Sequence, residues 1–183
     1  MGVKIQFMPI ILNVNGESPQ FGKKNSIAPN ATITGKVKTG DQCSFWFSAV
    51  VRGDVNEIVL GNKVNVQDNA TIHCTYKKTK TIIGNNVTIG HNAVVHGCTI
   101  HDNVLIGMGA IIMDNAVIGN NTIIAAGAVV LEGTIVENKS IYAGIPARKV
   151  KEISQEMVAG EIDRIASAYV KYAKWYGDQF MIT

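Results

Sequence analysis

Apolar residues recur at every sixth position through most of this chain. Aliphatic side chains fill these positions in phased runs: Ile27 and Ile33; Leu60, Val66 and Ile72; Ile83, Ile89 and Val95; and Ile100, Ile106, Ile112, Ile118, Ile124 and Val130. Small or β-branched residues lie four places later, at Ala31, Val37, Val64, Ala70, Val87, Ala93, Thr99, Val104, Ala110, Ala116, Thr122 and Ala128. Neither the three-and-four spacing of an amphipathic helix nor the variable turn spacing of a sandwich is present. The pattern is a hexapeptide repeat.

A period of six predicts short strands joined by corners. Three hexads would close a triangular coil of about 18 residues, and each coil buries its aliphatic side chains only by stacking on the next. The expected fold class is therefore mainly β, a parallel β-helix.

The repeat ends in the segment 142–150, and a helical pattern follows it. Apolar side chains after that point are spaced by 3, 4, 3 and 4 residues, at Ile162, Ile165, Tyr169, Tyr172 and Tyr176. This spacing places them on one stripe of an α-helix. We expect a β-helix domain over residues 1–150 and a C-terminal helical extension over 151–183 that packs on the outer wall of the coil or on a neighbouring subunit.

The repeat also assigns each strand to one of three faces, A, B and C. Leu60 falls on face A, Val66 on B and Ile72 on C. The step from Ile72 to Ile83 is five residues longer than one hexad, and we expect the extra residues to form a loop over 75–80. Counting then continues with face A at Ile83.

This count brings two of the four histidines together. His73 and His96 each follow an aliphatic residue of face C, so they occupy one column, one coil apart, and point outward. Adjacent coils lie about 4.8 Å apart, and two nitrogens on a tetrahedral zinc ion lie about 3.4 Å apart. A small tilt of the rings closes that difference. His91 follows Ile89 on face B, so a second copy of the chain would have to supply it, and we interpret His101 as an ordinary solvated side chain.

Further polar residues fall in the same two columns. A three-residue excursion within 54–59 would place Arg52 in the column of His73, and Gln67 and Asp68 lie in the column below His91. Arg52 and Asp54 by themselves would form only a surface salt bridge, which contributes little to stability.

Composition narrows the class of protein. Of 183 residues, 46% are hydrophobic and 17% are charged, a composition that argues against a disordered chain. The net charge of +3 is spread along the sequence without a basic patch, which argues against nucleic acid as a partner. The three cysteines, Cys43, Cys74 and Cys98, form no C-x-x-C pair, so a reducing compartment is expected. No stretch is long enough to span a bilayer. We expect a cytoplasmic protein without a membrane partner.

Four strings of the sequence resemble one family. They are VVRGD, NVQDNATIH, IGHNAVVHGCTI and AGIPARKV, and together they resemble the gamma-class carbonic anhydrases over roughly residues 8 to 150. The resemblance implies a left-handed β-helix, a homotrimer with a metal ion between adjacent subunits, and hydration of CO2 to bicarbonate. It also implies that His73 and His96 from one chain and His91 from the next are the zinc ligands. An open fourth position on the zinc would hold a water whose pKa falls to about 7, a value known for carbonic anhydrase itself.

The resemblance implies roles for other residues as well. Gln67 would orient the hydroxide or the substrate, Asn65 belongs to the same catalytic group, and Arg52 with Asp54 and Asp68 would tie the subunits together beside the metal. The best-known members carry acidic residues for proton transfer after the RGD aspartate and in the loop after the first histidine. Here these places hold Val55 and, in the loop, Tyr76, Lys77 and Lys78, so the proton shuttle is missing or different.

Three other functions are compatible with these features. The same metal site would serve an acyl-CoA thioesterase; a hexapeptide acyltransferase would need one catalytic histidine and no metal; and a non-catalytic assembly subunit would keep the site as a structural staple. A site of three histidines also suits Fe(II) and Co(II) as well as zinc.

Overall fold

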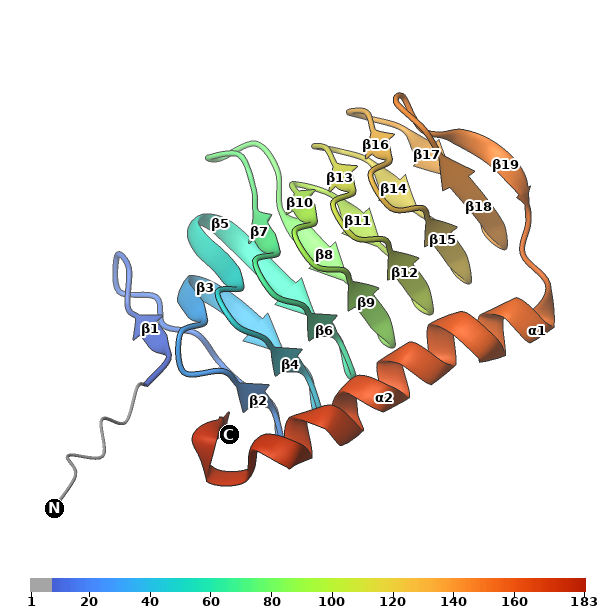
Figure 1. Ribbon diagram of the computed structural model, residues 1–183. Helices are drawn as coiled ribbons and strands as arrows, with labels where there is room; N and C mark the ends of the chain where they lie inside the picture. The colour runs from blue at the N-terminus through green and yellow to red at the C-terminus, as the bar shows by residue number, and fades with distance from the viewer. Residues whose placement is uncertain (1–7) are drawn as a thin grey trace, which may run out of the picture.

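The computed structural model describes residues 8–183 and shows a parallel β-helix with a helical segment running along one side (Figure 1). Wall B consists of β2 (Ser26–Ile27), β4 (Ser44–Phe45), β6 (Asn65–Val66), β9 (Val87–Ile89), β12 (Val104–Ile106), β15 (Thr122–Ile124) and β18 (Ser140–Ala143). Wall C consists of β1 (Ile10–Leu12), β7 (Thr71–His73), β10 (Val94–His96), β13 (Ile111–Ile112) and β16 (Val129–Val130). Wall A consists of β8 (Thr81–Ile83), β11 (Thr99–Ile100), β14 (Val117–Ile118) and β17 (Ile135–Val136).

Two longer strands, β3 (Thr32–Thr39) and β5 (Val50–Leu60), bend from wall C into wall A. Gly35 pairs with Gly53 and Val37 pairs with Ile58. Two residue steps in β3 therefore correspond to five in β5, so β5 carries three additional residues at the bend. The predicted excursion is confirmed, and it brings Arg52 into the column of His73.

The predicted repeat matches the buried core. Every aliphatic position of the repeat is at most 2% exposed, and the small residues between them are buried as well, with Thr99 as the exception. The step from Val95 to Ile100 is one residue shorter than the others, so Cys98, which is 1% exposed, takes the inward place that was expected for Thr99. Strand side chains alternate, and a shortened step moves the inward position by one residue.

Asparagines at the corners allow the chain to turn. Their φ angles lie between 53° and 59° at Asn69, Asn86, Asn92, Asn103, Asn115 and Asn121. This left-handed region is costly for most residues, and asparagine tolerates it better than any other residue except glycine. The polar residue between apolar runs is thus a requirement of the corner.

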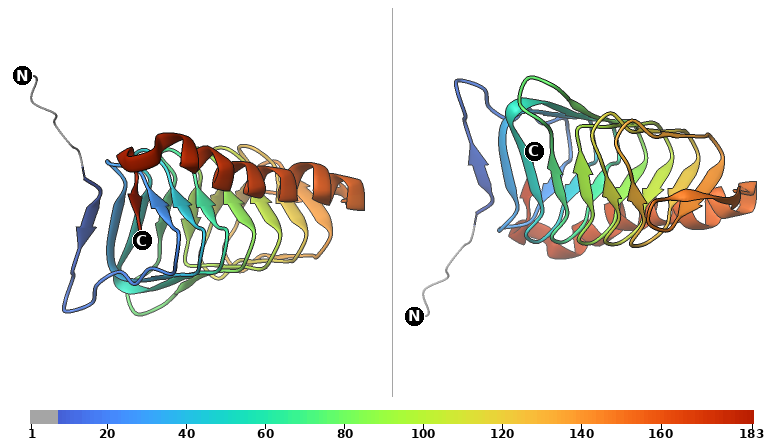
Figure 2. Two further views of the ribbon diagram at one scale, coloured as in Figure 1. Left: turned by 90° about the horizontal axis from the view of Figure 1, so that it is seen from below. Right: turned by 90° about the horizontal axis from the view of Figure 1, so that it is seen from above.

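The C-terminal segment forms α1 (Gln155–Met157), a π-helical stretch η1 (Val158–Asp163), α2 (Arg164–Ala173) and a 3₁₀ stretch η2 (Lys174–Gln179). It runs along wall B, as Figure 2 shows from two sides, and contacts β4, β9 and β12. Ile162 is fully buried, and the ring of Trp46 packs edge-on against Tyr169, Tyr176 and Phe180. The predicted apolar stripe therefore faces the coil.

Antiparallel strands close both ends of wall B: β19 (Arg148–Glu152) pairs with β18, and β20 (Met181–Ile182) pairs with β2. Within residues 8–183, none of the helices combines the length and the apolar character that a bilayer crossing demands.

Candidate metal centre

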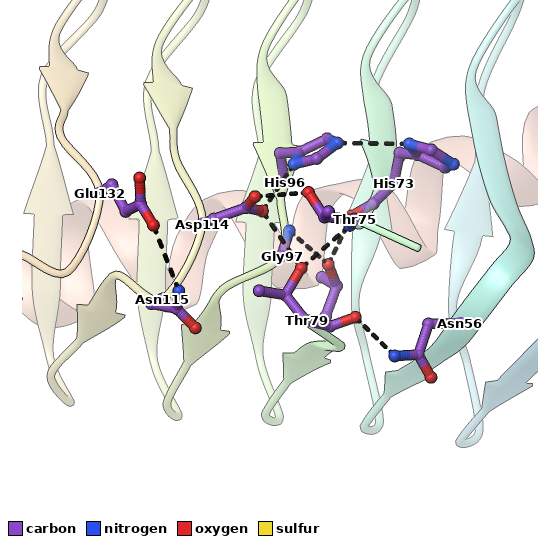
Figure 3. A network of polar contacts seen from close by, with 10 residues as sticks. Asn56, His73, Thr75, Thr79, His96, Gly97, Asp114, Asn115 and Glu132 are labelled. Carbon is purple, nitrogen blue, oxygen red and sulfur yellow. Dashed lines mark hydrogen bonds and ion pairs between the residues drawn. The ribbon is translucent and has the colours of Figure 1, made fainter. Parts of the chain in front are cut away.

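His73 and His96 stand side by side on the outside of wall C. They are the last residues of β7 and β10 and are partners in the strand register. His73 Nδ1 lies 3.3 Å from His96 Nε2 (Figure 3). Two nitrogens bound to one tetrahedral zinc ion lie about 3.4 Å apart. The predicted adjacency is confirmed, and the distance between the two nitrogens is close to that expected for a shared metal ion.

A carboxylate holds the opposite nitrogen of each ring. The pairs are His73 Nε2 with Asp54 Oδ1 at 3.1 Å, His96 Nδ1 with Asp114 Oδ1 at 2.7 Å, and His91 Nδ1 with Asp68 Oδ2 at 2.8 Å. Histidines that bind metals almost always place their second nitrogen against such an acceptor, which fixes the tautomer and raises the basicity of the ligand.

These pairs determine where the protons lie. Burial holds the pKa of His73 below its usual value, although the Asp54 carboxylate opposes this shift, so the ring is neutral at pH 7. Where each carboxylate accepts an N–H from its ring, His73 Nδ1 and His96 Nε2 face one another as lone pairs. A cation held by the two rings would satisfy both lone pairs and leave both carboxylate contacts in place.

The carboxylates themselves are ready to accept. Burial acts to raise the pKa of Asp54, but hydrogen bonds from Arg52 and His73 outweigh it and the pKa lies below its usual value. Burial also opposes ionisation of Asp114, and hydrogen bonds from Thr75 and His96 likewise hold its pKa below the usual value. Both side chains are therefore anionic at neutral pH.

His91 lies apart from this pair, at the corner that follows β9. Its Nε2 meets the hydroxyl of Tyr169 at 3.3 Å. Burial, and after it the Asp68 charge, raises the pKa of Tyr169 to about 12, so its hydroxyl stays protonated at neutral pH. Among residues 8–183, no three His, Cys, Asp or Glu side chains gather closely enough to hold a metal ion. One chain thus places two of the three predicted ligands, His73 and His96, together and the third, His91, apart from them.

The other predicted site residues divide between these two parts. Arg52 forms an ion pair with Asp54 and so joins the His73 side. Gln67 and Asn65, both nearly fully buried, lie on the His91 side. Gln67 accepts from the His91 backbone N–H at 3.2 Å and donates to Asn65 Oδ1 at 3.1 Å, and Asn65 donates to Thr88 at 2.8 Å. This chain of hydrogen bonds fixes the corner that carries His91.

Two contributors were not predicted from the sequence, Asp114 and Tyr169. Asp114 comes two residues after Ile112 of face C, so the same column count would have placed it beside Gly97, one coil beyond His96. The helical stripe indicated that Tyr169 faces inward. Its position along the wall depends on how far the helix is displaced, and the spacing of the stripe carries no information on that.

An apolar hollow of about 410 Å³ opens beside His91. Leu105, Ile123 and Met108 line it from the coil and Ile165 from the helix, while Gln67 and His91 form its polar end. It offers room for an apolar substrate next to one part of the site.

Comparisons with known proteins agree with this fold. The family model described as bacterial transferase hexapeptide (six repeats) matches residues 80–110 and 97–132, in accord with the predicted left-handed β-helix. A solved hexapeptide transferase family protein from Anaplasma phagocytophilum superimposes with a TM-score of 0.86 at 35% identity, covering 91% of this chain and 98% of that chain.

Two similar proteins carry the name carbonic anhydrase. The carbonic anhydrase of Geobacillus kaustophilus is 41% identical over 167 residues, which is 91% of this chain and 91% of the relative. Mitochondrial gamma carbonic anhydrase 2 of Arabidopsis thaliana is 35% identical over 174 residues, which is 92% of this chain and 62% of the relative. With identities of this size over nearly its whole length, the protein belongs to the gamma-class carbonic anhydrase family.

Proposed function

We propose that the protein hydrates CO2 to bicarbonate at a metal site completed between two copies of the chain. His73 and His96 of one copy and His91 of the next would be the ligands. The observation that carries this proposal is the pair of ring nitrogens 3.3 Å apart, each ring backed by a carboxylate. The relatives named as carbonic anhydrases supply the reaction.

The assembly that we propose is a homotrimer. One copy would contribute wall C and the next the corner after β9, so the interface would join two different surfaces. Heterologous contacts of this kind form a closed ring when the rotation between copies closes, and we propose that three copies close it. Exposed apolar side chains flank both parts: Met113 and Leu131 continue the column of His96 at 38% and 44% exposure, and Met108 beside His91 is 59% exposed. A neighbouring copy would cover them.

The chemistry divides between the metal ion and the chain. His73, His91 and His96 would hold a divalent ion, which would supply an acidified water as the nucleophile near neutral pH. We propose zinc, and the same ligands also accept Fe(II) or Co(II). Gln67 keeps one amide N–H beyond its bond to Asn65 with which to orient the reactants, and Tyr169 would release His91 Nε2 when the metal binds. Arg52, with Asp54 and Asp68, would hold the two copies together.

The residues at the places that carry proton-transfer groups in the best-known members are not acidic in this chain. Val55 and the exposed loop residues Tyr76, Lys77 and Lys78 occupy the places that carry acidic residues in the best-known members, and Lys77 lies over the Tyr76 ring. We therefore expect hydration to be slow and its rate to rise with buffer concentration. The free, buried thiols of Cys43, Cys74 and Cys98 fit a reducing compartment, and we propose a cytoplasmic location.

The direct test is stopped-flow CO2 hydration by the metal-loaded protein. The wild type should exceed the buffer rate and His96→Ala should not, because it removes one ligand. His101→Ala, an exposed histidine outside the site, is the matched control and should behave as the wild type. A metal-loaded wild type without hydration above the buffer rate would reject the proposal.

Hydrolysis of an acyl thioester is a second candidate. The apolar hollow beside His91 favours it, because an acyl chain could lie there with its carbonyl toward the metal. Release of free thiol from acyl-CoA substrates by the wild type, absent in His96→Ala, would support this function in place of CO2 hydration.

A further inference from the structure

Asp114 connects the metal-binding ring of His96 to the loop 75–80. One carboxylate oxygen, Oδ1, accepts from His96 Nδ1 at 2.7 Å and from Thr79 Oγ1 at 3.2 Å. The other, Oδ2, accepts from Thr75 Oγ1 at 2.6 Å (Figure 3). One side chain thus holds the ring and both ends of the loop.

The loop has few other attachments. It pairs with no strand in the described chain, and its own backbone bonds run only from Lys78 and Thr79 back to the Thr75 carbonyl. Thr79 is 6% exposed, and its hydroxyl also accepts from the backbone N–H of Thr75. Its carbonyl oxygen accepts from Asn56 Nδ2. The side chains between these ends, residues 76–78, are exposed. Lys80, the last residue of the loop, pairs with Glu57 at 3.1 Å. The threonine bonds to Asp114 are therefore the restraint on the side of the loop that faces the histidines.

The surrounding corner is shaped to admit this carboxylate. A Cβ at Gly97 would lie 1.8 Å from Asp114 Oδ1 and 2.3 Å from Thr79 Oγ1, so only glycine leaves room for the three groups to meet. Glu132, the carboxylate one coil further along the same column, is exposed and contacts neither a histidine nor the loop.

We propose that Asp114 is a positioning residue that couples metal binding at His96 to the order of the loop 75–80. A cation on His96 Nε2 makes the Nδ1–H a stronger donor, which tightens its bond to Asp114 and fixes the acceptor for Thr75 and Thr79. Coupling of this kind is reciprocal, so a well-held loop also favours metal binding. The inference rests on the proposed role of His96 as a ligand.

Cobalt(II) titration of the metal-free full chain, followed by visible absorption, tests whether Asp114 strengthens metal binding. Asp114→Ala should bind cobalt about 10- to 100-fold more weakly than the wild type, the range found when such outer partners are removed. Asp114→Asn should fall between the two, because its amide oxygen still accepts from His96. Glu132→Gln should match the wild type, and thermal unfolding of the metal-free proteins shows whether each variant is folded.

Limited trypsin digestion tests whether metal binding orders the loop 75–80, because Lys77 and Lys78 are exposed cleavage sites in it. Cobalt should slow cleavage there in the wild type, and Asp114→Ala should be cut faster and at a rate that cobalt no longer changes. Unaltered cobalt affinity and unaltered cleavage in a folded Asp114→Ala protein would overturn the inference and leave the proposed function intact. A wild type that binds no cobalt would overturn both.

Discussion

Each histidine of the candidate site obtains its carboxylate from a different structural source. Asp54 comes from the bend of β5, Asp114 from the coil after His96, and Asp68 from the coil before His91. Parallel stacking makes this arrangement available, because every residue has a neighbour in the same column one coil away in each direction. His101, an exposed histidine to which residues 8–183 offer no such carboxylate, lacks this restraint on its orientation.

Gly97→Ala is the sharpest single-residue test of this packing. The φ angle of Gly97 is +56°, and an added Cβ would collide with Asp114 and Thr79. We expect a loss of about 1 to 3 kcal/mol in the free energy of unfolding, together with weaker cobalt binding, measured by thermal unfolding and absorption titration. Gly127→Ala is the control, since Gly127 has a φ of +66° with no atom within 4 Å of the added Cβ. It should be destabilised by backbone strain but bind cobalt normally; equal cobalt affinities in the two variants would contradict the expectation.

At the scale of elements, the sequence specified the coil more completely than the site. The six-residue period predicted the walls, the bend in β5 and the loop 75–80, because burial selects the same residue type at every turn. It misplaced Thr99, since one shortened step shifts the alternation without changing the apolar content. It did not by itself single out Asp114 as a partner of His96, because the register places Asp114 beside Gly97 and the contact with the ring depends on how the two side chains turn on the outer surface.

The helical segment shows the same division. The spacing of the sequence predicted its apolar stripe. The contact of Tyr169 with His91 depends in addition on the position of the helix along wall B, which its contacts with aromatic rings of that wall determine. The ring of Trp46, which follows β4, packs against the helical segment, with its centroid 5.1 Å from that of Tyr169 and 5.7 Å from that of Tyr176. The position of the helix is thus a property of packing between elements.

Trp46→Ala should therefore loosen the helix from wall B. Removal of a buried aromatic ring costs about 3 to 5 kcal/mol, and the loss of its contacts should speed hydrogen exchange in α2. Trp175→Ala removes a ring that is 68% exposed, so it should leave exchange in α2 close to that of the wild type. Equal exchange rates in the two variants would show that other contacts hold the helix.

For the whole molecule, the decisive property is that one chain separates the proposed ligands. The three-sided coil aligns His73 with His96 on wall C, and the same geometry directs His91 from a different corner. A rigid stack of coils cannot fold back to bring these parts together, so a shared site requires a second copy.

Complementation between two inactive variants tests this arrangement. A chain with His91→Ala keeps the pair on wall C, and a chain with His96→Ala keeps His91. In the proposed trimer, a mixture of the two would therefore contain some interfaces with all three proposed ligands. Random assembly of equal amounts restores about one quarter of the sites, and cobalt binding and CO2 hydration of the coexpressed, differently tagged chains should recover to about that fraction. Coexpression of His73→Ala with His96→Ala restores none, because both losses fall on the same part. If the first mixture stays as inactive as the second, the ligands are not shared between copies.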